Sequence, residues 1–565
     1  MQLIAYQLQE THLMAKRIGR KYHSKRLGEN YDTIVIGSGI GGLCSAAILA
    51  KSGQKVCVLE QHYTAGGFTH TYVRNGYEWD VGVHYVGDVQ KPWSPIRRVF
   101  DFISDGELKW EFMDEVYDKI IIGEKEYDYV AGRHNFAEKM KQYFPGEEAA
   151  IDEYIQRISQ VNSLIPRFFA GQNMPRQIGM LFNKFRKHLV PDYFNRPVIE
   201  VLHELTDNDE LIGVLAGQWG DYGHPPGEAS FLIHALIAKH FLAGGNYPVG
   251  GSSKIAETIL PVIKSTGGEV FTYAEVDKII IEKNTAKGVR LANGDEIRAK
   301  NIVSAAGITN TVARFLPESV AEQHGFIKKV KKTPPSSSHL CLYIGLKEAA
   351  SELNLPKTNY WVYNSHDHDA EVARFKADQS GNLPLTYISF PSAKDPEHDN
   401  NYPGRSTIEV LTMCEYDWFK QWKGTPWGKR GADYEAYKEE LSQKLLKVLF
   451  KHFPHLEGKI DYYELSTPLS TEKFQLNDKG EIYGLVHTPE RFEQNWLHPK
   501  SPIKGLYLTG QDVLTAGVGG ALLAGVMTAA NMLGLKGLSM IKDIFMGKNQ
   551  KTAKPITSTK KTASV

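Results

Sequence analysis

A single glycine-rich turn near the N-terminus constrains the fold of this 565-residue chain more than any other feature. The apolar run Thr33–Ile36 leads into the turn, and an alanine-rich stretch to Lys51 follows it. The turn consists of Gly37, Ser38, Gly39, Ile40, Gly41 and Gly42. Three glycines at this spacing let the chain turn tightly, approach a pyrophosphate and pack a helix against a strand. The pattern therefore predicts a strand, a turn and a helix whose positive N-terminal end faces the phosphates.

The residues after this predicted helix support a dinucleotide site. A second strand, Lys55–Leu59, ends at Glu60, which stands 18 residues after Gly42. In dinucleotide folds a carboxylate at this place hydrogen-bonds the adenosine ribose. The alternative is a glycine turn with a purely structural role. Because strand, turn, helix, strand and acid occur in order, we predict a bound dinucleotide with Glu60 and Gln61 at its ribose end.

A second glycine motif indicates which dinucleotide is bound. Gly66 and Gly67 stand six residues past Glu60 and precede Phe68. The motif resembles that of flavin-dependent amine oxidases and phytoene desaturases, in which this backbone passes close to the diphosphate and the flavin. A plain surface turn is the alternative. The resemblance implies FAD as the cofactor, with Gly66, Gly67 and Phe68 beside it; amine oxidases usually carry Arg where Phe68 stands.

The stretch from Tyr77 to Tyr85 resembles the same family's Asp-x-Gly-x-His segment beside the isoalloxazine ring. Its matching residues are Asp80, Gly82 and His84. The resemblance implies that His84 and Tyr85 face the substrate, and no other catalytic candidate stands out. The alternative is a hydrogen-bonded histidine in a loop under the cofactor.

Two further segments resemble cofactor contacts of this family. The loop Tyr247–Ser253 leads into a predicted helix, and Val276 on the following strand stands where the family's backbone contacts the adenine. An ordinary start of a helix, capped by Ser252 or Ser253, is the alternative for the loop.

The segment Leu506–Ala521 resembles the C-terminal flavin motif of the family. The resemblance implies that Asp512, with Gly510 before it, hydrogen-bonds the ribityl–phosphate region of FAD. It also implies that the helix N-terminus near Gly519 points at the pyrimidine edge of the flavin. A positive helix end there would stabilise negative charge on the reduced flavin.

From Tyr31 to Leu533 the chain resembles the retinol saturase and carotenoid isomerase branch of the phytoene desaturase-like FAD oxidoreductases. Segments such as Thr358–Tyr363, Phe390–Pro396 and Pro403–Thr407 carry the resemblance outside the glycine motifs. It implies an FAD-dependent oxidoreductase that acts on CH–CH bonds of an apolar conjugated polyene, such as a retinoid or carotenoid. The leading expectation is saturation of one C=C bond, as in all-trans-retinol 13,14-reductases.

Three alternative functions remain open at this point. The same flavin could serve a carotenoid cis–trans isomerase or desaturase, which the product's mass would separate from a reductase. Non-catalytic binding proteins for prenylated partners, of the GDP-dissociation-inhibitor type, share the fold, and a flavin spectrum would exclude them. An amine oxidase is disfavoured by Phe68 and would release peroxide with amines.

The order of strand-like and helix-like segments predicts an α/β fold. The length predicts more than one domain, because single cores seldom exceed about 250–300 residues. We expect a discontinuous, Rossmann-like FAD-binding domain and a substrate domain built from a mixed sheet and helices. The expected boundaries are 31–104, 245–335 and 481–535 for the first domain, 105–244 and 336–480 for the second, 1–30 for a helical lead-in and 536–565 for a basic tail.

Composition limits the partners of the chain. A net charge of +1 gives no overall field for nucleic acid. The four cysteines show neither metal nor redox spacing, so we expect no metal site and no disulfide framework. No second Gly-x-Gly-x-x-Gly motif in a βαβ context appears, so NAD(P)H, a reductase or a quinone would reach the flavin only by transient docking.

The sequence predicts a cytoplasmic location with possible peripheral contact to a membrane. Residues 1–30 lack the apolar core of a signal peptide, and no run of 18 apolar residues occurs. The stretch Pro175–Tyr193 mixes apolar and basic residues, and Lys536–Val565 has seven lysines against one acid. An apolar substrate and an anionic surface would both favour docking there. The alternative is a core-facing helix followed by a solubilising tail.

Overall fold

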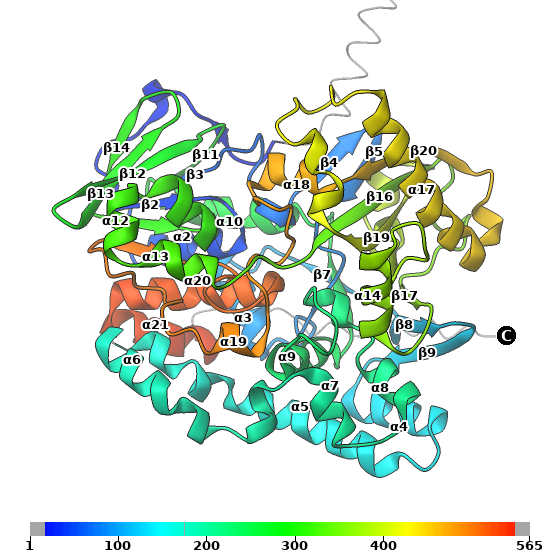
Figure 1. The fold of residues 1–565 in the computed structure, drawn as a ribbon. Coiled ribbons are helices and arrows are strands. Elements are labelled where there is room, and N and C mark those ends of the chain that lie inside the picture. Colours follow the sequence, from blue (N-terminus) through cyan, green and yellow to red (C-terminus); the bar gives the residue numbers. More distant parts are fainter. Residues whose placement is uncertain (1–16, 175, 549–565) are drawn as a thin grey trace, which may run out of the picture.

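A six-stranded sheet forms one half of the molecule in the computed structural model, which describes residues 17–174 and 176–548 (Figure 1). The strand order is β1-β11-β3-β2-β15-β21, and all neighbours are parallel. The strands are β1 (Arg20–Lys21), β2 (Thr33–Ile36), β3 (Val56–Leu59), β11 (Glu269–Thr272), β15 (Asn301–Ser304) and β21 (Leu506–Leu508).

The central strands of this sheet are apolar throughout because both of its faces are covered. Along β2, Ile34 and Val35 are fully buried and enter two different hydrophobic cores, as alternating side chains of a strand must. Helix α2 packs against α10 and α20 on one face. These helices are α2 (Ile40–Lys51), α10 (Lys254–Lys264) and α20 (Gly517–Leu533).

A seven-stranded mixed sheet forms the other half of the molecule. Its order is β20-β16-β19-β18-β17-β8-β9, in which only the β17–β8 pair is parallel. The strands are β8 (Val116–Ile122), β9 (Lys125–Val130), β16 (Ser338–Leu346), β17 (Asn359–Tyr363), β18 (Thr386–Ser389), β19 (Ser406–Cys414) and β20 (Ile460–Ser466).

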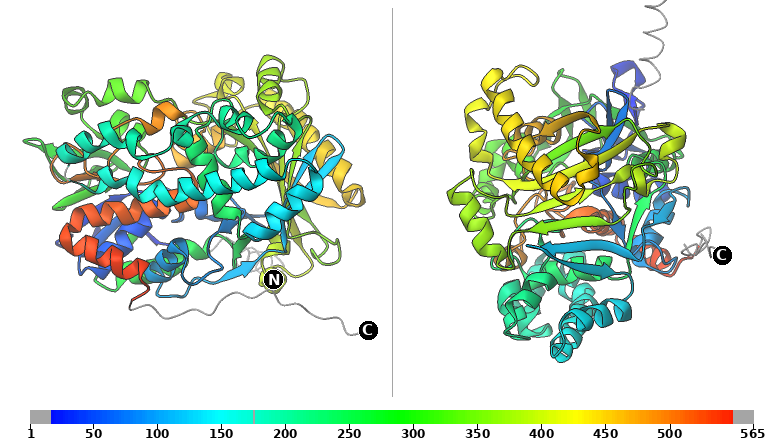
Figure 2. Two further views of the ribbon diagram at one scale, coloured as in Figure 1. Left: turned by 90° about the horizontal axis from the view of Figure 1, so that it is seen from below. Right: turned by 90° about the vertical axis from the view of Figure 1, so that its right-hand side faces the viewer.

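Helices cover both faces of the mixed sheet. One group lies below it in Figure 1, and Figure 2 shows the yellow helix α17 (Ala432–His452) on the opposite side. The lower group is α4 (Arg133–Tyr143), α5 (Glu148–Phe168), α7 (Val198–His203), α8 (Asp209–Leu215) and α9 (Phe231–Phe241), whereas α6 (Arg176–Phe185) lies below the parallel-sheet half.

Smaller elements connect the two sheets. The remaining strands are β4 (Thr71–Arg74), β5 (Tyr77–Asp80), β6 (Val86–Gly87), β7 (Trp110–Phe112), β10 (Gly245–Pro248), β12 (Val276–Glu282), β13 (Thr285–Leu291) and β14 (Glu296–Arg298). The remaining α-helices are α3 (Pro95–Ile103), α11 (Ile308–Asn310), α12 (Glu318–Gln323), α13 (Phe326–Lys331), α14 (His368–Ala377), α15 (Pro391–Lys394), α16 (His398–Asn401), α18 (Pro468–Gln475), α19 (Pro489–Phe492) and α21 (Leu535–Phe545).

The predicted α/β class, with a Rossmann-like sheet and a mixed sheet plus helices, is confirmed. The expected domain boundaries stay a prediction. The helical lead-in is wrong for the described residues 17–30, which hold the strand β1 and a 3₁₀ turn at Ser24–Arg26. The reason is tertiary, because Arg20 and Lys21 pair with Phe271 and Thr272 at the sheet edge. Residues 1–16 lie outside the described part.

The four cysteines are buried free thiols. In the part of the chain that the structure describes, no helix is long and apolar enough to cross a membrane. Within those same residues, no group of three or more His, Cys, Asp or Glu side chains is arranged to hold a metal ion.

Candidate active site

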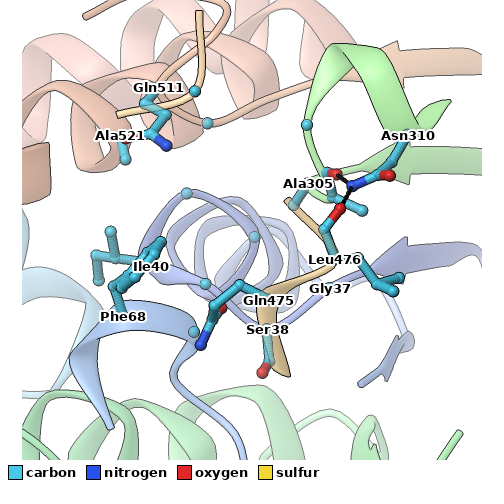
Figure 3. Close-up of a pocket in the computed structure, with 18 of the residues that line it drawn as sticks. Gly37, Ser38, Ile40, Phe68, Ala305, Asn310, Gln475, Leu476, Gln511 and Ala521 are labelled. Carbon is cyan, nitrogen blue, oxygen red and sulfur yellow. Dashed lines mark hydrogen bonds between the residues drawn. The ribbon is translucent and has the colours of Figure 1, made fainter. Parts of the chain in front are cut away.

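A groove runs along the edge of the parallel sheet where β2, β3, β15 and β21 end (Figure 3). Its wall includes the predicted glycine turn and segments from much later in the chain, such as Asn310, Gln475 and Gln511. The predicted cofactor residues that line it are Gly37, Ser38, Gly39, Ile40, Gly41, Gly42, Glu60, Gln61, Gly66, Gly67, Phe68, Val276, Gly510 and Asp512. The structure therefore brings together residues that the sequence spreads over more than 470 positions.

Two glycines of the turn meet different surroundings. A Cβ at Gly42 would lie 2.4 Å from the carbonyl oxygen of Gly37, so only glycine allows this close packing of helix on strand. A Cβ at Gly39 would meet nothing within 4 Å, although Gly39 lines the groove. Gly39 is also the N-cap of α2 and makes no side-chain cap. An open face beside the first N–H groups of a helix fits a pyrophosphate.

Glu60 holds the two glycine motifs in place. Its Oε2 accepts hydrogen bonds from the backbone N–H of Ser38 (2.9 Å) and from the Ser38 hydroxyl (2.6 Å). Its Oε1 accepts from the backbone N–H of His62 (2.8 Å). The Ser38 hydroxyl in turn accepts from the N–H of Gly66 (3.1 Å). The carboxylate lies at the groove and braces the turn around it.

Asp512 joins three distant segments. Its Oδ2 accepts from the N–H of Ile308 (2.7 Å), and its Oδ1 accepts from the N–H of Leu485 (2.9 Å). Each carboxylate oxygen keeps a lone pair for a further donor. Two neighbouring groups that sequence reasoning missed are Thr509 Oγ1 and Asn310 Oδ1, which are buried at the groove and have no hydrogen-bond partner among the described residues. Orphaned polar atoms of this kind fit a hydroxylated and phosphorylated cofactor.

The helix α10 is not capped by a serine side chain of the preceding loop, which the alternative interpretation expected. Ser253 is the N-cap of α10, but its side chain makes no cap hydrogen bond. The backbone N–H of Ser252 instead donates to Asp80 Oδ1 (3.1 Å). This contact ties the loop to the Asp-x-Gly-x-His segment.

A second cavity of about 630 Å³ adjoins the groove. Both are bordered by Gly82, Ile482, Tyr483, Gly517 and Val518, so the two spaces meet there. His84, Tyr85 and Gly519 line this second cavity, and Gly519 is the one predicted cofactor residue that does not line the groove. The rest of the wall is mainly apolar, with Ile165, Phe169, Ile233, Ile237, Phe241, Leu411 and Met413.

His84 both faces this cavity and has a hydrogen-bond partner, so the two interpretations of it are compatible. Its Nδ1 lies 2.7 Å from Glu409 Oε2. Burial lowers the pKa of His84 to about 3, and the imidazole is neutral. Burial raises the pKa of Glu409 to about 8. Sequence reasoning missed Glu409, which is a lone acid within the apolar strand β19.

Tyr85 stands between two carboxyl groups that the sequence analysis also missed. Its hydroxyl lies 2.9 Å from Asp118 Oδ2 and 3.0 Å from Asp221 Oδ2. Its ring stacks on Phe241 with centroids 4.0 Å apart. Nearby, the buried Lys394 ammonium donates to the carbonyl of His84 (3.0 Å). The signal that could have found Asp118 is a charge inside the apolar run of β8.

Comparisons with known proteins agree with this geometry. Residues 35–103 match the NAD(P)-binding Rossmann-like domain, and residues 195–533 match the family described as flavin containing amine oxidoreductase. A solved putrescine oxidase superposes with a TM-score of 0.58 at 16% identity, covering 89% of this chain and 99% of that one. This last similarity concerns the fold.

Curated relatives narrow the branch. An all-trans-retinol 13,14-reductase of Danio rerio is 34% identical over 563 residues, covering 95% of this chain and 92% of that protein. A chloroplastic prolycopene isomerase of Daucus carota is 27% identical over 543 residues, covering 91% and 82%. The predicted family and the flavin-dependent oxidoreductase class are confirmed. The chain belongs to the flavin-containing amine oxidoreductase family, in the branch of the all-trans-retinol 13,14-reductases.

Proposed function

We propose that this oxidoreductase saturates one C=C bond of an apolar conjugated polyene, with FAD held in the groove. The junction of groove and apolar cavity at Gly82, Tyr483 and Gly517 carries the proposal. A cavity of about 630 Å³ lies in the usual range for small-molecule sites. A polyene that buries on the order of 400 Å² would gain about 10 kcal/mol before ordering costs, at ~25 cal/mol per Å².

Different residues of the groove would contact different parts of FAD. Glu60 would hold the adenosine ribose, the backbone at Val276 the adenine, and the N–H groups after Gly39 the pyrophosphate. Asp512 would hold the ribityl–phosphate region. The start of α20, which has no side-chain cap, would face the flavin near Gly519. When bound, FAD supplies two-electron hydride chemistry.

The side chains of the cavity contribute orientation and exclusion of water. Apolar walls from α5 and α9 would keep a conjugated chain extended towards the junction. Neutral His84 and the hydroxyl of Tyr85 stand at that end. A polar group at one end of an apolar cavity gives the substrate one orientation.

Product mass tests the proposal. The holoprotein, reduced with dithionite under anaerobic conditions, is incubated with all-trans-retinol. A product that gains two hydrogens supports the reductase. An unchanged mass with a shifted absorption spectrum would instead indicate the isomerase, which the prolycopene isomerase relative keeps as the second candidate. No change in mass or spectrum would contradict both. A flavin-free preparation is the control.

The electron donor is proposed to dock transiently. The cofactor motif at Gly37–Gly42 is the only one of its kind in the sequence, so NAD(P)H would bind without a dedicated domain. Anaerobic bleaching of the flavin by NADPH, NADH or a quinol, each added alone, identifies the donor. A flavin that none of these bleaches would point to a protein reductase.

Peripheral contact with a membrane is proposed at the exposed apolar residues of α6 and α21. On α6, Ile178, Leu181 and Phe185 are 58%, 58% and 60% exposed, and their spacing places them on one face. Exposed Leu538 lies on α21, whose Phe545 lines the cavity. On α21 an exposed apolar surface thus adjoins the apolar cavity, as a substrate dissolved in lipid requires.

The structure also corrects part of the expected membrane surface. Arg186 is buried, donates to the carbonyl of Phe492 and lies over the Phe168 ring (4.1 Å), so it is no surface cation. Ile544 is fully buried in the core, because α21 packs against α3 and α20. Pro175 and the tail from residue 549 lie outside the described residues.

A further inference from the structure

The hydroxyl of Tyr85 lies between two carboxyl groups and cannot satisfy both as anions. It is 2.9 Å from Asp118 Oδ2 and 3.0 Å from Asp221 Oδ2. A phenol has one proton to donate and otherwise accepts. If both acids were ionised, one carboxylate oxygen would face the phenol oxygen without a proton between them. One of the two acids therefore carries a proton.

The surrounding donors identify Asp118 as the anion. Its Oδ1 accepts from the Asn359 amide (2.9 Å), and its Oδ2 accepts from the Gln218 amide (2.7 Å). The carbonyl oxygen of the same Asn359 accepts from the Lys394 ammonium. The charged form of Asp118 is favoured by the two amide donors and by the Tyr85 hydroxyl. It is also favoured by the Lys394 ammonium, which bonds the Asn359 side chain that contacts Asp118.

Asp221 lacks such support. Among the described residues its side chain has one hydrogen-bond partner, the Tyr85 hydroxyl. The titratable groups that interact electrostatically with Asp221 include Asp118 and six tyrosines, Tyr85, Tyr117, Tyr222, Tyr363, Tyr387 and Tyr483. Burial and the charge of Asp118 both raise the pKa of Asp221 well above its usual range. In this arrangement Asp221 donates to Tyr85, and Tyr85 donates to Asp118.

The location of Asp221 gives this proton a use. Asp221 ends the 3₁₀ turn Trp219–Asp221 and lines the apolar cavity together with Tyr85, whereas Asp118 lies behind them. Asp221 keeps part of its surface accessible, and Asp118 keeps none. A neutral acid is thus exposed to the space in which we place the polyene.

We propose that Asp221 is the general acid of the saturation reaction, an inference that rests on the proposed function. Bound reduced FAD would supply a hydride for a new C–H bond at one carbon of the double bond and would lose two electrons in doing so. The π electron pair then takes the proton of Asp221 at the neighbouring carbon, as the O–H bond of Asp221 breaks. Tyr85 is a positioning residue, whose hydroxyl can turn to donate to the new carboxylate. Water regains access when the product leaves and returns the proton.

The substitution Asp221→Asn removes the acidic proton of Asp221 but keeps a hydrogen-bond donor to Tyr85. The amide N–H still donates to Tyr85, so the variant should fold and keep FAD, but it cannot release a proton. Infrared difference spectra between wild-type holoprotein and this variant at neutral pH should lose one carboxylic acid C=O band. An Asp118→Asn variant should ionise Asp221 at lower pH, since the neighbouring negative charge is gone. A difference spectrum without the acid band would overturn the protonation of Asp221.

Single turnovers test the catalytic role. With dithionite-reduced holoprotein and all-trans-retinol, Asp221→Asn should slow flavin reoxidation by roughly 100- to 10,000-fold, the usual effect of a general acid. Its reduction by dithionite should be unchanged. The wild-type rate should fall as pH rises through the ionisation of Asp221, and the residual rate of the variant should not. Tyr434→Phe is the matched control, because it removes a buried hydroxyl that bonds the Thr467 hydroxyl, and neither residue lines the cavity.

The outcomes are distinguishable. If Asp221→Asn loses the infrared band but turns over at the wild-type rate, the acid role is overturned. The assignment of the proton to Asp221 would then still stand. A wild-type protein that leaves the mass of retinol unchanged would contradict the proposed function, and the infrared result would still decide where the proton lies. Slow turnover in both Asp221→Asn and Tyr434→Phe would overturn the proposal in favour of a general packing effect.

Discussion

Gly39 and Gly42 are three residues apart, yet side chains at these positions would have opposite effects. A Cβ at Gly39 points into open groove, and the backbone there (φ −60°) suits any residue. Gly39→Val should therefore leave the thermal stability of the apoprotein unchanged while abolishing FAD retention, since its side chain occupies the space for the pyrophosphate.

Gly42→Ala serves as the matched comparison. Its methyl group would collide with the carbonyl of Gly37 at 2.4 Å, so overpacking should cost roughly 1–3 kcal/mol of unfolding free energy. Flavin absorbance per protein and calorimetric Tm measure the two effects. A Gly39→Val protein that purifies with normal flavin content would remove the groove as the cofactor site.

Glu409 should give the stability a specific dependence on pH. Burial raises its pKa from 4.5 to about 8, so the folded state keeps a proton that the unfolded chain releases. Stability from this group is therefore present at low pH and is lost as pH rises through that window. Glu409→Gln is neutral throughout and keeps an acceptor for the Asp80 N–H. Its stability relative to wild type should increase from about pH 5 to about pH 8. Denaturant unfolding at several pH values measures this, and a constant difference would contradict it.

At the scale of residues, the sequence predicts those parts of the site whose residues lie close together in one short segment. The glycine turn, Glu60 and the Gly510–Asp512 motif lie within short segments whose spacing predicts their neighbours. Asp118 and Asp221 come together from segments about 100 residues apart, and no spacing encodes such a meeting. Only a charge within an apolar strand hints at a buried network.

At the scale of elements, periodicity located the strands and helices of the core but not the edge strand. Val276 lies on a strand as expected, β12 (Val276–Glu282), and the alanine-rich stretch ends at Lys51 as α2 does. At Arg20–Lys21 the basic composition favoured a helix. Backbone pairing with β11 decides that segment instead, and pairing partners cannot be read from local composition.

The exposed face of α6 makes a prediction at this scale. A variant with Ile178→Ser, Leu181→Ser and Phe185→Ser should lose most binding to anionic liposomes, since it removes the apolar residues that would enter the interface. High salt should weaken wild-type binding only through the basic residues. Co-sedimentation measures both.

A matched control replaces exposed aromatic residues elsewhere, Tyr273→Ser with Trp427→Ser. This control should bind liposomes as wild type does. Equal loss in both variants, or wild-type protein that stays in the supernatant, would exclude α6 as the docking surface. Deletion of α21 and the residues after it is not a suitable test of membrane binding, because it would remove the buried side chain of Ile544 from the core.

At the scale of the whole molecule, groove and cavity should be separable in function. Ile237 on α9 lines the apolar cavity and does not line the groove. Ile237→Trp should fill the cavity and reduce polyene turnover at least tenfold, about 1.4 kcal/mol or more, while FAD content stays normal. Ile237→Val is the conservative control and should stay near wild type. Turnover and flavin absorbance on the same samples decide the matter, and a Trp variant with full turnover would contradict a substrate in this cavity.

Strand β21 and Asp512 have a consequence for how the protein is made. They lie about 200 residues after β15 (Asn301–Ser304), yet they complete the parallel sheet and tie together Ile308 and Leu485. A nascent chain on the ribosome therefore displays one side of β15 as an unpaired edge until β21 has been made, and such edges invite aggregation. The groove in which we place FAD is incomplete before β21 and Asp512 have been made, so bound flavin cannot shelter that edge while the earlier strands emerge. Cofactor binding is therefore expected only after Asp512 has left the ribosome.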